Sequence, residues 1–333
     1  MTMHPSPPDE RLAAVTLDVL IRHSLVPSAD GWAVQVAPGG STDRTFSVLD
    51  PAGTPRLTVR LARPGLADRL RHEQRVLNEL ARAPQNVALD LPGEDLVTVA
   101  PAPCEITLVE DDALPERWLL SHEHMPGSPA PITDVSTAAR EELGASLAWV
   151  HRHQRDGYMI WPSLDVQFGT RADAYHARLV TLRRYTAAQG LLPEADRLLD
   201  RLAGAELPVS AGWQETDFFL CHGDLSIGNI LWHGESVRLI DWEFARDGDA
   251  AEDIAYLVAE QNLTPDVVAE IAEAYVDASG DPWAFARLPT WLPLVALDAA
   301  LWWADYHLAQ GEDPLAQVDV SSRLERASEF LKG

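Results

Sequence analysis

The chain has 333 residues, of which 51 are Asp or Glu and 26 are Lys or Arg, so its formal net charge is −25. At ~100–200 residues per domain this length favours two domains, and a hydrophobic share of 46% is typical of a globular protein. The acidic balance excludes nucleic acid and a polybasic membrane anchor, because binding to phosphates needs concentrated positive charge.

The first 130 residues predict a small β-rich domain. Apolar residues at helical spacing, among them Leu12 and Leu20, predict a short opening helix. Short apolar runs broken by Gly, Pro and Asp then predict a β-meander. In chain order we expect a helix over residues 10–25, strands between residues 32 and 63, a helix over residues 66–82, and strands at 96–109 and 117–124. The pair Pro126 and Gly127 ends this half.

The rest of the chain is mainly helical. We expect helices over residues 136–153, 172–188, 193–204, 250–261, 264–279, 290–309 and 316–331, with a strand–loop–strand block at 217–241. The sequence thus predicts an α+β fold of two domains: residues 1–120 with a small antiparallel sheet, and residues 121–333, mainly helical. The second domain holds 34 of the 51 acidic residues, which favour either a cationic ligand or a surface adapted for solubility or salt.

Lysine and cysteine are both rare. Lys332 is the only lysine, so a Schiff-base lysine or a lysine on a phosphate has no candidate inside the fold. Cys104 and Cys221 form no pair at metal or redox spacing, which is typical of a reducing compartment. The N-terminus lacks a signal-peptide core, and no run of ~18 apolar residues predicts a membrane span. We therefore expect a cytoplasmic protein with no membrane and no obligate protein partner.

The segment from residue 220 to 257 carries the chemistry. It contains His222-Gly223-Asp224, then Asn229, then Asp241 at the end of an apolar run. The apolar segments between them predict a hairpin that brings Asn229 and Asp241 side by side. Phosphoryl transfer needs one carboxylate at the attacking hydroxyl, and a carboxamide and a second carboxylate on Mg²⁺. Each residue alone could cap a turn or end a strand, but the ordered set predicts phosphoryl transfer.

This segment resembles the catalytic block of the aminoglycoside phosphotransferase and choline kinase superfamily, distant relatives of the protein kinases. The family's HGDxxxxN pattern is present from His222 to Asn229, and its ID[WF]E pattern at residues 240–243. The resemblance implies a protein-kinase-like fold of two lobes, with a small antiparallel sheet in the first lobe and a larger, mainly helical second lobe. It also implies ATP as co-substrate and Mg²⁺.

The resemblance assigns roles to particular residues. It implies that Asp224 is the catalytic carboxylate and that His222 braces the loop that carries it. Asn229 and Asp241 would hold the magnesium ion, and Asp253 would fix the backbone of the loop.

Nucleotide-binding residues are expected upstream, in the family's order. The turn with Gly40, Ser41 and Thr42 lies where family members cover the phosphates, and its amides and hydroxyls could cradle them. Arg60 lies on the next strand, where family members carry a basic residue for the α- and β-phosphates, and Glu73 would be its ion-pair partner. Taken alone, the segment with Gly40, Ser41 and Thr42 could equally be an ordinary hairpin turn, and Arg60 could be an exposed strand arginine.

The sequence also departs from the protein kinases. Their strand lysine is absent, so its role falls to Arg60 or is absent too. Arginine is a reasonable substitute, since a planar guanidinium engages phosphate oxygens in bidentate fashion. Their Asp-Phe-Gly becomes Asp241-Trp242-Glu243, and no activation segment is visible, which favours a small-molecule kinase. Backbone groups near Glu123 and His124 resemble the family's hinge and would hold the adenine.

The acceptor is less defined. A late helical segment places Asp298, Trp302 and Asp305 along one face, and aromatic rings beside carboxylates suit an ammonium group. We expect these three residues and Glu243 to contact a small, cationic acceptor of the aminoglycoside type. Choline, ethanolamine or thiamine is the alternative, and the aromatic stripe could instead be core packing. A non-catalytic nucleotide-binding relative is the second class of function, made conceivable by the missing lysine.

Overall fold

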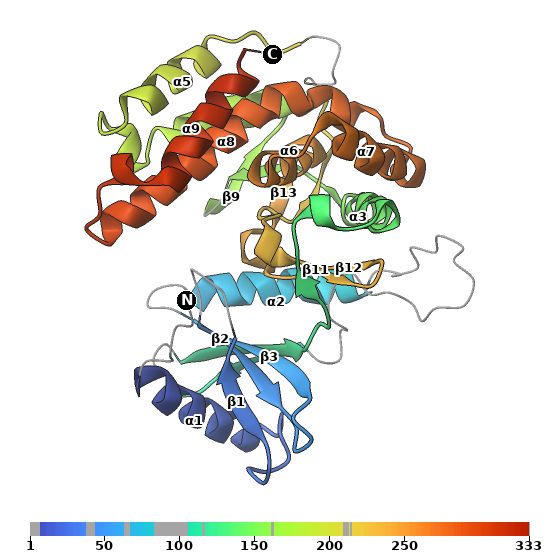
Figure 1. Ribbon diagram of the computed structural model, residues 1–333, viewed down its shortest axis with the longest axis vertical. Helices are drawn as coiled ribbons and strands as arrows, with labels where there is room; N and C mark the ends of the chain where they lie inside the picture. Colours follow the sequence, from blue (N-terminus) through green and yellow to red (C-terminus); the bar gives the residue numbers. More distant parts are fainter. Residues whose placement is uncertain are drawn as a thin grey trace. The chain divides into compact units, whose positions relative to one another are not determined.

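The computed structural model describes residues 7–37, 44–62, 67–82, 106–114, 117–160, 163–208, 213 and 215–332. The chain forms two units, each of which is described separately here (Figure 1). Unit 1 comprises Met1–Pro129 and Gly228–Phe244, and unit 2 comprises Ala130–Ile227 and Ala245–Gly333.

Unit 1 is built on an antiparallel sheet with the strand order β1-β2-β3-β5-β4. Its elements are α1 (Pro7–Arg22), β1 (Ala33–Val36), β2 (Arg44–Leu49), β3 (Pro55–Leu61), α2 (Ala67–Arg82), β4 (Thr107–Glu110) and β5 (Trp118–Glu123). The turn from β2 to β3 is closed by Asp50, whose carboxylate accepts from the amides of Ala52 and Thr54 at 2.9 Å each. An Asp that bonds its own turn in this way fixes the hairpin register.

The helices α1 and α2 lie on opposite sides of this sheet (Figure 1). Side chains alternate along β3, so Val59 and Leu61 join the core cluster with α1 while Arg60 points to the other face. On α2 the buried residues recur every three or four positions, and Glu73 is one of them. The strand and the helix thereby bring Arg60 and Glu73 together.

A second small sheet completes unit 1. It has the order β12-β11-β6, from β6 (Ser128–Pro129), β11 (Ile230–His233) and β12 (Ser236–Leu239). The 3₁₀ turn η5 (Trp242–Phe244) follows and packs on α2, where the Trp242 amide donates to Glu73 Oε1 at 3.3 Å. Residues 121–129 and 228–244 therefore belong to unit 1, whereas the sequence places them in the second domain, because their strand pairing and helix contacts are not visible as sequence spacing.

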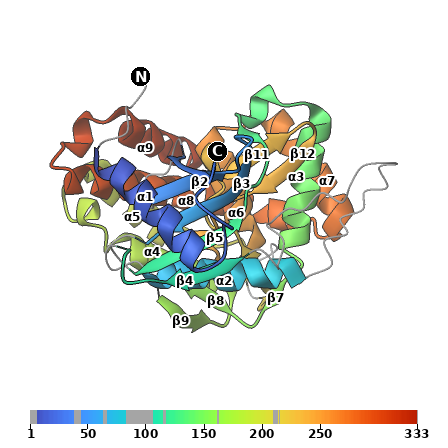
Figure 2. The same ribbon diagram turned by 90° about the horizontal axis from the view of Figure 1, so that it is seen from below.

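Unit 2 is mainly helical. Its helices are α3 (Thr137–Val150), α4 (Arg171–Leu182), α5 (Pro193–Ala203), α6 (Ala250–Gln261), α7 (Pro265–Ser279), α8 (Trp283–Ala309) and α9 (Val318–Phe330). The pairs α8–α9, α6–α8 and α3–α7 pack side by side, the last seen clearly in Figure 2. Gly144 allows the close approach of α3 to α7, since a Cβ there would overlap the carbonyl oxygen of Ile271.

The α+β fold class is confirmed, and most predicted elements lie within a few residues of their expected bounds. The helix expected to begin at residue 290 begins at Trp283, because Pro289 and Pro293 lie inside it rather than at its start. Four short strands of unit 2 were not predicted: β7 (Gln154–Arg155), β8 (Tyr158–Ile160), β9 (Ser163–Phe168) and β13 (Arg246–Gly248). The first part of the strand expected at 96–109, and Cys104, lie outside the described residues.

Among the residues that the structure describes, one helix is long and apolar enough to cross a membrane, judged by length and composition. Over its most apolar 18 residues α8 has a mean hydropathy of 1.2, although polar residues interrupt it, and this is why the sequence pattern showed no continuous apolar run. Of that stretch 67% is buried inside the protein, against α6 and α9 among others. These contacts identify α8 as the core helix of unit 2.

Candidate functional site

Unit 1 gathers two arginines and three acidic residues at one point. Arg60 Nη1 donates to Glu73 Oε2 at 2.6 Å and to Asp241 Oδ1 at 2.7 Å. Its Nη2 lies 3.6 Å from Glu243 Oε2, and Arg69 approaches the same oxygen at 3.5 Å. The side chains of Arg60, Glu73 and Glu243 are at most 5% exposed, whereas that of Asp241 is 24% exposed. Asp241 is therefore the acid of this group that a ligand can reach.

The charges of this group are not balanced by Arg60 alone. Burial raises the pKa of Glu73 to about 7, and the carboxylates of Asp241 and Glu243 act in the same direction, against the lowering effect of Arg60. Near neutral pH, Glu73 is therefore present in both its ionised and its protonated form, although it contacts an arginine. A cluster this acidic favours an added cation.

Asn229 and Asp241 lie at the open end of the β11–β12 hairpin. The amide of Ile240 donates to the Asn229 carbonyl at 3.0 Å, so the residue next to Asp241 is held beside Asn229. Asp241 has a φ of +67°, a left-handed conformation that is uncommon outside glycine and that often marks a functional residue. Carboxylate and carboxamide oxygens are the ligands that Mg²⁺ prefers, so the two residues fit that ion.

Unit 2 holds the loop from His222 to Asp224. Asp253 fixes its backbone: Oδ2 accepts from the His222 amide at 2.8 Å and Oδ1 from the Gly223 amide at 2.9 Å. Gly223 has a φ of +84°, which a side chain would strain. The Asp224 amide lies 3.3 Å from Nδ1 of His222, whose side chain is fully buried. This loop presents Asp224, which is partly exposed, from a tightly bonded backbone.

Burial disfavours the charged form of a carboxylate, but the neighbours of Asp253, near the start of α6, stabilise its charge. Burial acts to raise its pKa, but the hydrogen bond from His151, electrostatic interactions with His151 and His222, and the Gly223 amide outweigh burial and lower the pKa to about 2. Asp253 is therefore ionised throughout the physiological range. This explains why it can hold two amides at once.

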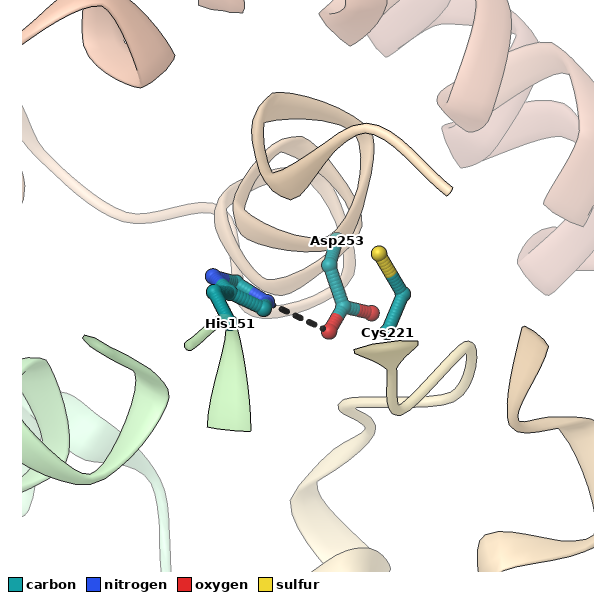
Figure 3. A group of neighbouring side chains, drawn as sticks. All are labelled: His151, Cys221 and Asp253. Atoms are coloured by element: carbon teal, nitrogen blue, oxygen red, sulfur yellow. Dashed lines mark hydrogen bonds and ion pairs between the residues drawn. The ribbon is translucent and has the colours of Figure 1, made fainter. Parts of the chain in front are cut away.

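His151, Cys221 and Asp253 are close enough to suggest a metal site, and Figure 3 shows them together. Their ligand atoms lie within 4.8 Å of one another. However, both oxygens of Asp253 and both ring nitrogens of His151 already have hydrogen-bond partners. Burial raises the pKa of the Cys221 thiol well above its usual range, so the thiolate that a metal needs is disfavoured. The group is a hydrogen-bonded core of unit 2.

Two further acids, at the N-cap and in the first turn of α6, are buried beside arginines. Asp249 accepts from Arg287 at 2.7 and 2.8 Å and from Trp291 at 3.0 Å. Glu252 accepts from Arg178 at 3.0 Å and from Arg246 at 2.9 Å. Arg246 Nη1 also donates to the Gly223 carbonyl at 3.4 Å, so the loop is held on both its amide and its carbonyl side. The segment from residue 220 to 257 contains both acids and Arg246, but Arg178 and Arg287 come from distant segments and were missed.

The residues expected to bind the acceptor have structural partners. Asp298 pairs with Arg178 and accepts from the Tyr185 hydroxyl at 3.0 Å. Asp305 accepts from the amides of Thr186 and Ala187 at 2.9 and 2.7 Å, which makes it a cap for that turn. Glu243 is fully buried against the arginines of unit 1, so a role in acceptor binding is not supported. Each of these carboxylates was visible in the sequence, whereas its partner was not.

Trp302, the remaining acceptor candidate, is partly exposed. Its ring stacks on that of Tyr306, with centroids 5.7 Å apart and an angle of 11° between the planes. This pair offers a flat aromatic surface on α8. It is the part of the predicted acceptor region that keeps an accessible ligand-binding group.

The expected nucleotide-binding residues divide into three groups. Arg60 and Glu73 form the expected ion pair, whereas Gly40, Ser41 and Thr42 lie outside the described residues. The His124 amide donates to the Arg56 carbonyl at 2.9 Å, so the sheet already uses that donor. The Glu123 carbonyl accepts from His122 Nδ1 at 2.7 Å and retains a second lone pair. Of the two expected hinge groups, the carbonyl is the one suited to an adenine.

Residues 33–291 match the profile described as the phosphotransferase enzyme family. No curated protein matches the sequence at a significant level.

Solved structures similar to this chain include phosphotransferases with different acceptors. A macrolide 2'-phosphotransferase from Brachybacterium faecium is 21% identical, with a TM-score of 0.60 over 95% of this chain and 97% of that one. A choline/ethanolamine kinase family protein from Mesorhizobium loti is 17% identical, with a TM-score of 0.59 over 96% and 95%. A thermostable mutant of an aminoglycoside phosphotransferase, solved with AMP-PNP and hygromycin B, is 15% identical, with a TM-score of 0.60 over 94% and 98%. At these identities the likeness establishes the fold, which is of the expected protein-kinase-like class.

Proposed function

The chain belongs to the phosphotransferase enzyme family, and on that premise we propose that it transfers the γ-phosphoryl group of ATP to a hydroxyl of a small molecule, with Mg²⁺ as cofactor. The observation that carries the proposal is the loop at Asp224. A carboxylate presented from a backbone that Asp253 and Arg246 fix on both sides is suited to orient one hydroxyl repeatedly.

In the proposed reaction, the acceptor oxygen attacks the γ-phosphorus in line with the bond to the β-phosphate oxygen. That bond breaks, ADP leaves, and the hydroxyl proton passes to the Asp224 carboxylate. His222 keeps the loop in place through its contact with the Asp224 amide. Asp224 thus orients the hydroxyl and receives its proton, and most of the rate comes from positioning.

Asn229 and Asp241 would hold Mg²⁺, which offsets the charge of the phosphates when it is bound. Arg60 is the phosphate-binding cation in this proposal. A guanidinium has five N–H donors, so Arg60 can keep Glu73 on one nitrogen and offer others to phosphate oxygens. The solved relative with AMP-PNP, whose adenosine and phosphate chain resemble ATP, supports ATP as the co-substrate.

The acceptor is proposed to be a small cationic alcohol, of the aminoglycoside type or an amino alcohol. Two features support a cation: the excess of acidic over basic residues in residues 121–333, which hold 34 acidic and 15 basic residues, and the stacked surface of Trp302 and Tyr306. Cys104 and Cys221 form no pair at metal or redox spacing, which supports a reducing, cytoplasmic location.

The test is Mg²⁺-dependent ADP formation across a panel of acceptors. The panel contains aminoglycosides, macrolides, choline, ethanolamine, thiamine and amino sugars, and the product is identified by its added phosphoryl group in mass spectrometry. A single acceptor with saturable turnover supports the proposal, and its charge decides between cationic and neutral acceptors. If ATP binds but no acceptor of the panel is phosphorylated, the result would favour the alternative, a non-catalytic nucleotide-binding relative.

A further inference from the structure

Behind the loop at Asp224, three helices of unit 2 meet through their side chains. His151 stands at the C-terminal cap of α3, Tyr275 lies on α7, and Asp253 lies on α6. His151 Nε2 is 3.2 Å from Asp253 Oδ2, and its Nδ1 is 3.1 Å from the Tyr275 hydroxyl. All three side chains are buried, and the proposed reaction uses neither His151 nor Tyr275 directly.

The bonding partners determine which ring nitrogen of His151 carries the proton. Asp253 is ionised and can only accept, and its Oδ2 already accepts the His222 amide, so Nε2 of His151 must be a donor. Burial raises the pKa of the Tyr275 phenol, which therefore keeps its proton. In a neutral ring Nδ1 then accepts from the phenol, and every polar side-chain atom of Tyr275, His151 and Asp253 has a hydrogen-bond partner.

We propose that Tyr275 and His151 are positioning residues for the phosphoryl transfer proposed above, on which this inference rests. The Tyr275 hydroxyl donates to Nδ1 of His151 and so stabilises the tautomer that donates from Nε2 to Asp253. That donation holds the Asp253 carboxylate in the orientation in which it binds the amides of His222 and Gly223. The bonded series runs from α7 through α3 and α6 to the loop that presents Asp224.

The packing of α3 on α7 makes this series rigid. Gly144 lets the two helices approach closely, and Arg152 ties them by donating to the Ala278 carbonyl at 2.6 Å. Arg152 follows His151 directly in the sequence but contacts α7 instead of Asp253. It therefore supplies a matched control, because its loss weakens the same interface without altering the hydrogen bonds of Asp253.

The experiment compares four variants in the full chain: His151→Leu, His151→Gln, Tyr275→Phe and Arg152→Met. For each we measure kcat and KM with the acceptor found by the panel, and amide hydrogen exchange at His222 and Gly223. His151→Leu is expected to lower kcat about 10- to 100-fold, since small errors in positioning have effects of that size, with little change in KM for ATP. Exchange at the two amides is expected to become faster.

The other variants separate positioning from stability. Gln can donate to Asp253 from near the Nε2 position, so His151→Gln should recover most of both properties. Tyr275→Phe should show a smaller loss of kcat in the same direction, and it keeps the inference testable if His151→Leu does not fold. Arg152→Met should lower the melting temperature while kcat and the two exchange rates stay at the wild-type level.

Two results would overturn the inference: unchanged exchange at His222 and Gly223 in both His151→Leu and Tyr275→Phe, or equal losses in Arg152→Met. The exchange measurement needs no acceptor. If the wild-type chain phosphorylates nothing, the proposed function fails, while exchange still decides whether Tyr275 and His151 hold the loop.

Discussion

Replacing Arg60 with methionine tests the acidic group of unit 1. Arg60 contacts Glu73 at 2.6 Å and Asp241 at 2.7 Å, and its side chain is 5% exposed. Methionine fills a similar volume but leaves the buried carboxylates of Glu73 and Glu243 with less compensating charge. Removing one partner of a buried ion pair costs about 3–5 kcal/mol of unfolding free energy, so Arg60→Met should lose that amount at pH 8.

The assay is urea-induced unfolding, with the free energy taken from the midpoint and the slope. Arg56→Met is the matched control, because Arg56 lies on the same strand and contacts Asp50 at 2.7 Å but is 58% exposed. Exposed pairs contribute little, so this control should lose only a small part of what Arg60→Met loses. Arg60→Lys should lie between the two, since an ammonium keeps the charge but replaces the planar fork with one nitrogen.

Protonation should relieve the Arg60→Met defect. A proton on Glu73 removes its charge, so the loss relative to wild type should be smaller at pH 6 than at pH 8. Equal losses in Arg60→Met and Arg56→Met, at either pH, would refute the view that Arg60 stabilises a buried acidic group.

Three other predictions concern stability. Burial lowers the pKa of His122 from 6.5 to about 4, so the unfolded chain takes up a proton that the folded one refuses. The contribution of His122 to stability should therefore fall by about 3 kcal/mol as the pH falls from 6.5 to 4, while Glu73, whose pKa is raised, acts in the opposite direction over the same range. His122→Gln should remove that part of the pH dependence, as followed by urea unfolding at several pH values. Asp305→Ala should cost about 1 kcal/mol by removing the cap of Thr186 and Ala187, with no change in KM for the acceptor; a raised KM would return Asp305 to the acceptor site. Gly144→Ala should lower the unfolding free energy by about 1–3 kcal/mol, because its Cβ overlaps the Ile271 carbonyl, and unchanged stability would mean that α3 and α7 can separate at no cost.

The sequence predicts the local features of this protein well. Helical periodicity places Glu73 on the buried face of α2, and the apolar runs around Asn229 and Asp241 predict the hairpin that brings them together. These features depend on residues close in sequence, where spacing carries the information.

The features that were missed depend on long-range pairs. Nothing near Asp298 in the sequence indicates that Arg178 would pair with it, 120 residues away, and the same holds for His151 and Asp253. A carboxylate with a partner and one that awaits a ligand look alike in a sequence. This is why three predicted acceptor residues, Asp298, Asp305 and Glu243, have structural partners and why the boundary of unit 1 extends beyond residue 120.

The measurement that tests the central proposal most directly is the turnover of Asp224→Asn with the acceptor identified by the panel. Asp217→Asn is its control, since Asp217 is an exposed aspartate shortly before the same loop. An amide cannot receive the hydroxyl proton, so Asp224→Asn should lower kcat about 100-fold or more while ATP binding and melting temperature stay near wild type, and Asp217→Asn should be fully active. Turnover of Asp224→Asn at the level of Asp217→Asn would contradict the assignment of Asp224 as the carboxylate that orients the acceptor.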